Sequence, residues 1–327
     1  MDLVFAEYDT RGLTAFAFPH VVMLDRETAV VSDRTGWLRQ LDIAAGRIRS
    51  QLFVGCTDVL GVCILPTCIE LDSLCIDPAS HGSCAVATRG GYAAVWRIGA
   101  DTFQRLTPLE GGSVNAVAYS AGGGFIALGL GFYPLADRRP ARAEQAAIEV
   151  WAVDEDPSEC HGRYALPGVC VDGIAWAPES DHIWCATGVR SQRGGLLMKL
   201  VPGTLRPVIF EELPFAMVRT LIYAQDQSGN DFLVIAHRCG AAAFSTDGLL
   251  LWYVETPECV DKSVGITDLA YSPETDQVLL SNGLIVSGRE GREIWRLPPL
   301  AGCTSVAVRP GGGYVGVSQS GVLRCWD

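Results

Sequence analysis

Arginine is the residue type whose placement could do chemistry in this sequence. Eight arginines recur in polar stretches between apolar runs, and one tyrosine accompanies them: Arg34, Arg89, Tyr133, Arg138, Arg139, Arg142, Arg190, Arg193 and Arg238. A guanidinium fork matches the geometry of carboxylates and phosphates. In a chain of net charge −12, clustered arginines would focus positive potential on one local surface. We predict that these residues bind a partner; ordinary solvation of polar turns is the alternative interpretation.

Cysteines and carboxylates offer two further kinds of site. Cys56, Cys63, Cys68 and Cys75 lie close together in the chain, but they lack the paired Cys-x-x-Cys spacing of a zinc site. We therefore expect no metal there and interpret most cysteines as reduced, buried thiols. Four aspartates are candidates for a shared metal site, although such residues more often cap turns: Asp58, Asp72, Asp172 and Asp268.

The sequence lacks the motifs of the common catalytic sites. It contains no Gly-x-Ser-x-Gly elbow, no phosphate-binding Walker loop and no His-Glu-x-x-His pair. The five histidines are scattered without ligand spacing. We therefore predict no catalytic residues and no cofactor, and we expect that the protein is not an enzyme.

Composition limits the remaining classes. Hydrophobic residues make up 49% of the 327 residues, which is ample material for a core. The net charge of −12 argues against broad binding to nucleic acid or to an anionic membrane. The first residues are acidic rather than basic, and the longest apolar stretch, 59–69, is interrupted by Pro66. We expect a soluble, cytoplasmic protein without a signal peptide.

The candidate residues lie within a repeated pattern of short apolar runs and turn residues. Residues 113–153 contain an apolar strand, a Gly turn at 122–124, a second apolar strand, a polar excursion and a third strand that ends near Trp151. Short apolar strands repeated at a period of about forty residues are typical of the blades of a β-propeller. Seven stretches have the composition of the first strand in this unit: 15–18, 73–76, 116–119, 173–176, 220–223, 268–271 and 305–308.

This pattern resembles the WD40-like propeller family. The resemblance is carried by Trp96, Trp151 and Trp326 near strand ends, by the C-terminal Trp-Asp pair, and by the Ser-Pro-Glu-x-Asp turn at 272–276. No Gly-His pair precedes the first strands, so we expect the histidine–aspartate network of that family to be absent. The resemblance implies an all-β, seven-bladed β-propeller with four-stranded antiparallel blades. It also implies that an N-terminal strand at 3–6 completes the last blade and closes the ring.

Two irregular spacings break the repeat. We predict one propeller domain over residues 1–327, with insertions at 55–71 and 131–147. In a propeller, the links between blades and the second-to-third-strand loops emerge on the same face, the top face. Both insertions and the arginines are therefore expected on that face, where a rigid frame would present surface loops for function.

The leading functional hypothesis is a non-catalytic protein-interaction scaffold or regulatory subunit. Its top-face loops would bind another protein that carries an acidic patch. Two alternatives stay open: a propeller that binds an anionic phospho- or carboxylate-bearing ligand, and a metal-dependent enzyme with a site in the central channel. The Ala-, Gly- and Arg-rich texture suggests a bacterial source.

Overall fold

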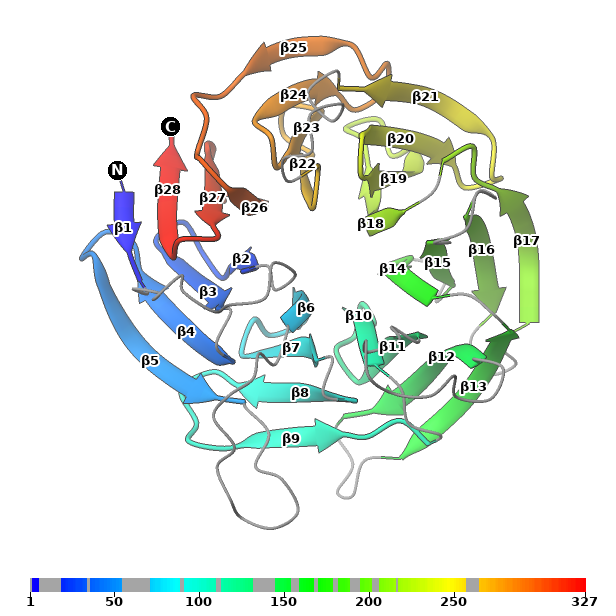
Figure 1. The fold of residues 1–327 in the computed structure, drawn as a ribbon, viewed down its shortest axis with the longest axis horizontal. Coiled ribbons are helices and arrows are strands. Elements are labelled where there is room, and N and C mark those ends of the chain that lie inside the picture. The colour runs from blue at the N-terminus through cyan, green and yellow to red at the C-terminus, as the bar shows by residue number, and fades with distance from the viewer. Residues whose placement is uncertain are drawn as a thin grey trace, which may run out of the picture.

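Seven antiparallel sheets of four strands are arranged in a ring around a central axis (Figure 1). The computed structural model describes residues 2–5, 19–33, 36–54, 71–88, 91–109, 113–131, 145–153, 159–167, 170–178, 182–188, 195–201, 206–215, 217–256 and 265–327. Within these ranges all regular secondary structure is β-strand. The described residues contain no helix that is long and apolar enough to cross a membrane. The predicted all-β, seven-bladed propeller is confirmed.

Blades 1 to 6 take their strands in chain order from the inside of the ring to the outside. The strands of blades 1 to 4 are β2 (Val21–Met23), β3 (Thr28–Ser32), β4 (Trp37–Asp42) and β5 (Arg47–Phe53); β6 (Leu71–Ile76), β7 (Ser83–Thr88), β8 (Tyr92–Arg97) and β9 (Phe103–Leu106); β10 (Ser113–Tyr119), β11 (Phe125–Gly131), β12 (Gln145–Ala152) and β13 (Cys160–Pro167); β14 (Cys170–Trp176), β15 (Ile183–Gly188), β16 (Leu196–Val201) and β17 (Arg206–Glu212).

Blades 5 and 6 follow the same order, and blade 7 combines the two ends of the chain. Their strands are β18 (Val218–Gln225), β19 (Asp231–His237), β20 (Gly240–Ser245) and β21 (Leu250–Glu255); β22 (Leu269–Ser272), β23 (Gln277–Leu280), β24 (Leu284–Ser287) and β25 (Glu293–Arg296); β26 (Cys303–Val308), β27 (Tyr314–Ser318), β28 (Val322–Trp326) and, outermost, β1 (Asp2–Val4).

The core lies between the blades because the middle strands are covered on both faces. In β19, for example, every residue from Phe232 to Ala236 is buried. Leu233 and Ile235 pack with blade 4, whereas Val234 and Ala236 pack with blade 6. This alternation explains why the second strands are continuous apolar runs rather than alternating ones.

The inner strands are joined from blade to blade by hydrogen bonds at one repeated position. The hydroxyl of Ser73 accepts a hydrogen bond from the backbone N of Val117 at 3.4 Å. In the same way, Ser305 Oγ accepts one from the backbone N of Val21 at 3.1 Å. At the equivalent Gly173, a Cβ would lie only 2.7 Å from the Cβ of Leu221 in the next blade. The next blade contacts this position directly, so the residue there is either small or hydrogen-bonded to that blade.

The N-terminal strand closes the ring as predicted. Strand β1 pairs antiparallel with β28 in the register Asp2↔Arg324, and both chain ends lie at this blade (Figure 1). The Arg324 guanidinium donates hydrogen bonds to both carboxylate oxygens of Asp2, at 2.7 and 2.6 Å. Phe5 is buried among residues of blades 1 and 7. The last blade thus acquires a fourth strand, and its open sheet edge is covered.

One predicted strand needs correction. The inner strand of blade 1 is Val21–Met23, which pairs with Ala29–Val31, and not residues 15–18, which lie outside the described residues. Asp25 explains why the inner strand lies closer to β3 than predicted. Its carboxylate accepts hydrogen bonds from the backbone N–H groups of Glu27 and Thr28, and these bonds form the tight turn that joins β2 to β3. The outer strands of blades 5 and 6, β21 and β25, expose large apolar side chains.

The alternating strand directions separate the turns onto two faces. Second-to-third-strand loops and blade-to-blade links emerge on the top face, and the other turns emerge on the bottom face. Hydrogen bonds between the two kinds of top segment show that they lie together: the backbone N of Val54 donates to the carbonyl of Gly36 at 2.9 Å. The strands that flank residues 55–70 and 132–144 end on this face. Those two segments, which make up most of the predicted insertions, lie outside the described residues.

Candidate functional site

Of the nine predicted partner-binding residues, Arg238 is the one that the structure describes. The other eight lie outside the described residues: Arg34, Arg89, Tyr133, Arg138, Arg139, Arg142, Arg190 and Arg193. That the nine residues share one surface therefore stays a prediction.

Arg238 is exposed on the top face and held by the links on either side of it. Its backbone N donates to the carbonyl of Met217 at 3.3 Å, and its carbonyl accepts from Ile266 N at 3.0 Å. A Cβ on Gly265 would lie 2.3 Å from that carbonyl, so only glycine allows this approach. Met217 adopts a φ of 62°, which is uncommon for a residue with a side chain. The two links thus fix the backbone from which the Arg238 guanidinium projects.

A stack of three rings lies beside Arg238. The ring of His237 is 4.3 Å from that of Phe215 and 5.2 Å from that of Tyr253, and all three planes are nearly parallel. Burial lowers the pKa of His237 to about 4, although the nearby Glu255 carboxylate opposes this shift. His237 is therefore neutral at pH 7 and acts as part of the packing beside the positively charged Arg238.

The four candidate aspartates do not form a described metal site. Asp58 lies outside the described residues, and Asp72 and Asp172 occupy bulged positions near the top of β6 and β14. Asp268 instead lies between blades 6 and 7, where it accepts hydrogen bonds from the Ser305 hydroxyl, Leu269 N and Val306 N. In the described part of the chain, no group of three His, Cys, Asp or Glu residues is placed to hold a metal ion.

Asp268 makes folding stability depend on pH. Burial raises the pKa of Asp268 to about 6, although hydrogen bonds from Ser305, Leu269 and Val306 partly offset the rise. In the unfolded chain this carboxyl titrates near pH 4. The raised pKa therefore stabilises the folded state fully below about pH 4, and this stabilisation is lost as the pH rises through 6. We expect the stability of the wild type relative to Asp268→Asn to fall by on the order of 2 kcal/mol between pH 4 and pH 8. Urea unfolding across this range measures it; a constant difference would contradict the assignment.

The described cysteines are free thiols, in agreement with the reduced state expected from the sequence: Cys75, Cys84, Cys160, Cys170, Cys185, Cys239, Cys303 and Cys325. Burial raises the pKa of the Cys75 thiol to about 12. Because metals bind the thiolate, this residue is poorly suited to the zinc site considered from the sequence. Cys56, Cys63 and Cys68 lie outside the described residues.

The structure reveals a surface that the sequence did not indicate. Six of the ten exposed large hydrophobic residues in the described ranges lie on the outer edges of blades 5 and 6. We call this set the apolar rim: Leu249, Leu250, Leu251, Tyr253, Ile294 and Trp295. Leu249 is the most exposed of the six at 68%, and the two leucines after it are each 50% exposed. Strands β21 and β25, which carry five of the six, follow one another along the outer edge of the ring (Figure 1).

One buried tryptophan joins the two halves of the apolar rim. Trp252 lies on β21 between exposed residues, and its indole N–H donates to the carbonyl of Gly288 in blade 6 at 2.7 Å. A Cβ on Gly291, whose φ is 64°, would lie 2.6 Å from this indole, so the β24–β25 turn packs directly on the ring. The outer edges of blades 5 and 6 are consequently fixed relative to each other.

Comparison with known proteins finds relatives at the level of structure. No protein-family model matches the sequence, and no curated protein matches it. The β-propeller domain of Cps50 (Swd1) from Myceliophteria thermophila superimposes with a TM-score of 0.68 at 14% identity, covering 100% of this chain and 99% of that one. Hydrazine synthase from Kuenenia stuttgartiensis superimposes with a TM-score of 0.75 at 11% identity, covering 98% of both chains. The likeness is one of fold. At identities this low, the comparison shows a shared propeller fold and does not indicate the function of this chain.

The three tryptophans behind the WD40-like resemblance occupy equivalent places in their blades. Trp96, Trp151 and Trp326 lie on the third strands β8, β12 and β28, each opposite the start of the second strand: Cys84, Ile126 and Tyr314. The repeated position confirms the predicted alignment of these three copies. It supports a propeller of repeated blades.

Proposed function

We propose that this chain is a non-catalytic protein-interaction module, a scaffold or regulatory subunit with WD40-like repeats. The apolar rim is the observation that supports the proposal. Contiguous apolar side chains on a protein surface mark interaction sites, because exposing them to water costs free energy that a partner recovers. Tryptophan and tyrosine, both present here, are also enriched at the energetic centres of interfaces.

The described polar groups agree with a binding role rather than catalysis. His237 is neutral and stacked, Asp268 is engaged with the next blade, and Cys75 is a buried thiol. None of them combines a perturbed pKa with an open cavity, which is the usual mark of a reacting group. Binding at the rim requires a rigid frame that holds apolar side chains exposed to solvent, and this ring provides such a frame.

The top-face arginines are a second part of the proposed surface. We propose that Arg238, with the other predicted arginines and Tyr133, pairs with acidic groups on the same partner. Tyr253 supports a connection between the two surfaces, because this rim residue stacks on His237, the neighbour of Arg238. A partner bound across β21 would lie next to Arg238.

Site-specific photo-crosslinking tests the function. A benzophenone amino acid replaces Leu250 or Trp295 in two rim variants, and it replaces Ile48 or Phe125 in two control variants. The controls are also exposed and apolar, at 42% and 39%, but they lie on blades 1 and 3. We expect both rim variants to crosslink the same protein in extracts of the source cells, and the controls to leave it free.

The crosslinked protein is then purified and tested for direct binding. We expect Leu250→Ser combined with Leu251→Ser to weaken its affinity at least tenfold, and Ile48→Ser to leave it unchanged. Crosslinking that is equal at rim and control positions, or an affinity insensitive to the rim substitutions, would refute the proposed function.

A further inference from the structure

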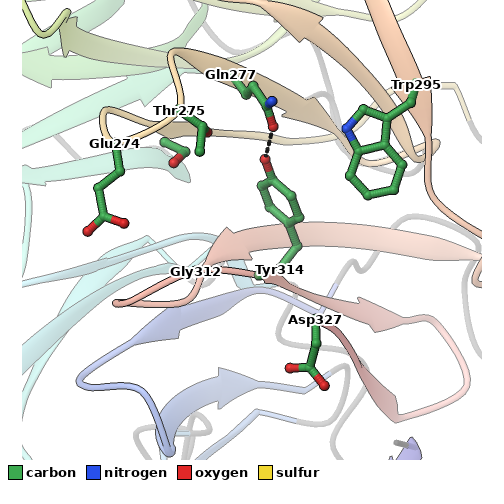
Figure 2. Close-up of a pocket in the computed structure, with 9 residues that line it drawn as sticks. Glu274, Thr275, Gln277, Trp295, Gly312, Tyr314 and Asp327 are labelled. Atoms are coloured by element: carbon green, nitrogen blue, oxygen red, sulfur yellow. Dashed lines mark hydrogen bonds between the residues drawn. The ribbon is translucent and has the colours of Figure 1, made fainter.

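A small pocket opens on the bottom face between blades 6 and 7, at the end of the apolar rim. Its walls come from the β22–β23 turn, the β26–β27 turn and the outer strand β25 (Figure 2). The volume is about 170 Å³. Sites for whole small molecules usually measure about 300–1,000 Å³, so this pocket suits a single side chain. Trp295 belongs both to its wall and to the apolar rim.

The charged groups that line the pocket are carboxylates. Glu274 and Asp327 contribute to the wall, and none of the nine lining residues is basic. Arg309 donates a hydrogen bond to Asp327 at 2.5 Å, but it is shielded: its side chain is 11% exposed, against 88% for Asp327. A ligand that approaches from solvent therefore meets negative charge first.

Aromatic rings supply the other attraction for a cation. Trp295 is 41% exposed beside the pocket. The Tyr314 hydroxyl donates to Gln277 Oε1 at 2.7 Å, which holds the phenol ring in place in the wall (Figure 2). Ammonium and guanidinium groups bind to the faces of such rings, and tryptophan is the strongest of the three aromatic types. Gly313, at a φ of 86°, keeps the opposing turn free of side-chain bulk.

We propose that this pocket receives a lysine or arginine side chain of the partner protein, while apolar residues next to it in the partner pack on the rim. The proposal rests on the proposed function and names the chemistry of the partner. Charge complementarity selects the occupant: the wall of a space the size of one side chain carries the carboxylates of Glu274 and Asp327 and the exposed ring of Trp295. At the level of the whole molecule, a net charge of −12 also favours approach of a basic segment.

Selection of random peptides tests the pocket directly. A phage library of random 12-residue peptides is selected on the intact wild-type protein, and the enriched peptides are synthesised for affinity measurements. We expect them to carry a lysine or arginine beside apolar residues. They should bind at least tenfold more weakly to the double variant Glu274→Gln, Trp295→Ala, and binding should weaken as the salt concentration rises. Replacing the basic peptide residue with norleucine should cause a similar loss.

One control variant and the rim variant separate this inference from the proposed function. Glu290→Gln removes a carboxylate outside the pocket wall, and we expect it to bind the peptides like the wild type. Thermal unfolding of every variant confirms that each is folded. Enriched peptides without a basic residue, peptides that bind the double variant equally well, or a selection without enrichment would overturn the pocket assignment. If Leu250→Ser with Leu251→Ser abolishes binding while the pocket variant does not, the interaction function stands and this inference falls.

Discussion

Replacing Glu149 with alanine is expected to destabilise the protein by about 3–5 kcal/mol, the usual cost of leaving a buried charge without its partner. The Glu149 side chain is fully buried and pairs with Arg163, whose Nη1 lies 3.2 Å from Oε1. It also accepts hydrogen bonds from the indole N–H of Trp151 at 3.0 Å and from Leu109 N at 3.2 Å. One carboxylate thus joins β12, β13 and the link from blade 2, and alanine would remove these three hydrogen bonds at once.

Equilibrium unfolding in urea measures this loss. Glu290→Ala is the matched control, because Glu290 pairs with Arg292 at 3.7 Å with both side chains largely exposed. Exposed pairs contribute about 0–1 kcal/mol, so the control should stay near the wild type. Similar midpoints for Glu149→Ala and the wild type would show that the carboxylate does not hold blade 3 together.

Removal of residues 1–5 is expected to destabilise the whole ring by at least about 3 kcal/mol. Burial of Phe5 alone accounts for this amount, since truncation of a buried phenylalanine to alanine costs about 3–5 kcal/mol. The deletion also removes the β1–β28 pairing and the bond from Phe5 N to the Gly321 carbonyl at 2.9 Å. Blade 7 would then present an open sheet edge, which promotes aggregation.

Point substitutions separate the side chain from the strand. Phe5→Ala should lose most of the stability lost in the deletion, whereas Val4→Ala, at a residue 59% exposed, should cost little. Chemical unfolding monitored by tryptophan fluorescence provides the comparison. A deletion variant with an unchanged midpoint would show that the ring does not depend on closure by the N-terminal strand.

The fold was readable from the sequence because its local signals agree with one another. The first strand predicted at 116–119 lies within β10, and the one predicted at 305–308 lies within β26. In both cases a turn-forming residue limits a short apolar run on each side, so few registers are possible. The first inner strand shows the limit of this reasoning. Residues 15–18 have the composition of an inner strand, and composition alone does not reveal that Val21–Met23 forms the pair with β3.

The functional surfaces were harder to predict, because exposure is a property of the assembled ring. The run Leu250–Val254 reads as a buried strand, yet its position as the fourth strand of a blade leaves most of it open to solvent. Two distant turns form the pocket walls, at 272–277 and 312–314, and only the stacking of blades 6 and 7 brings them together. The one available signal was the leucine run after the Asp247–Gly248 turn, in a place where other copies are polar.

Amide hydrogen exchange in the complex with the natural partner tests the central claim most directly. If the partner covers the apolar rim, exchange should slow at 249–255 and 290–296 and stay unchanged in the outer strands of blades 1 and 2, β5 and β9. Protection at Met217, Arg238 and Ile266 in addition would extend the interface onto the top face. Protection confined to the top face, with β21 and β25 exchanging as in the free protein, would contradict the account.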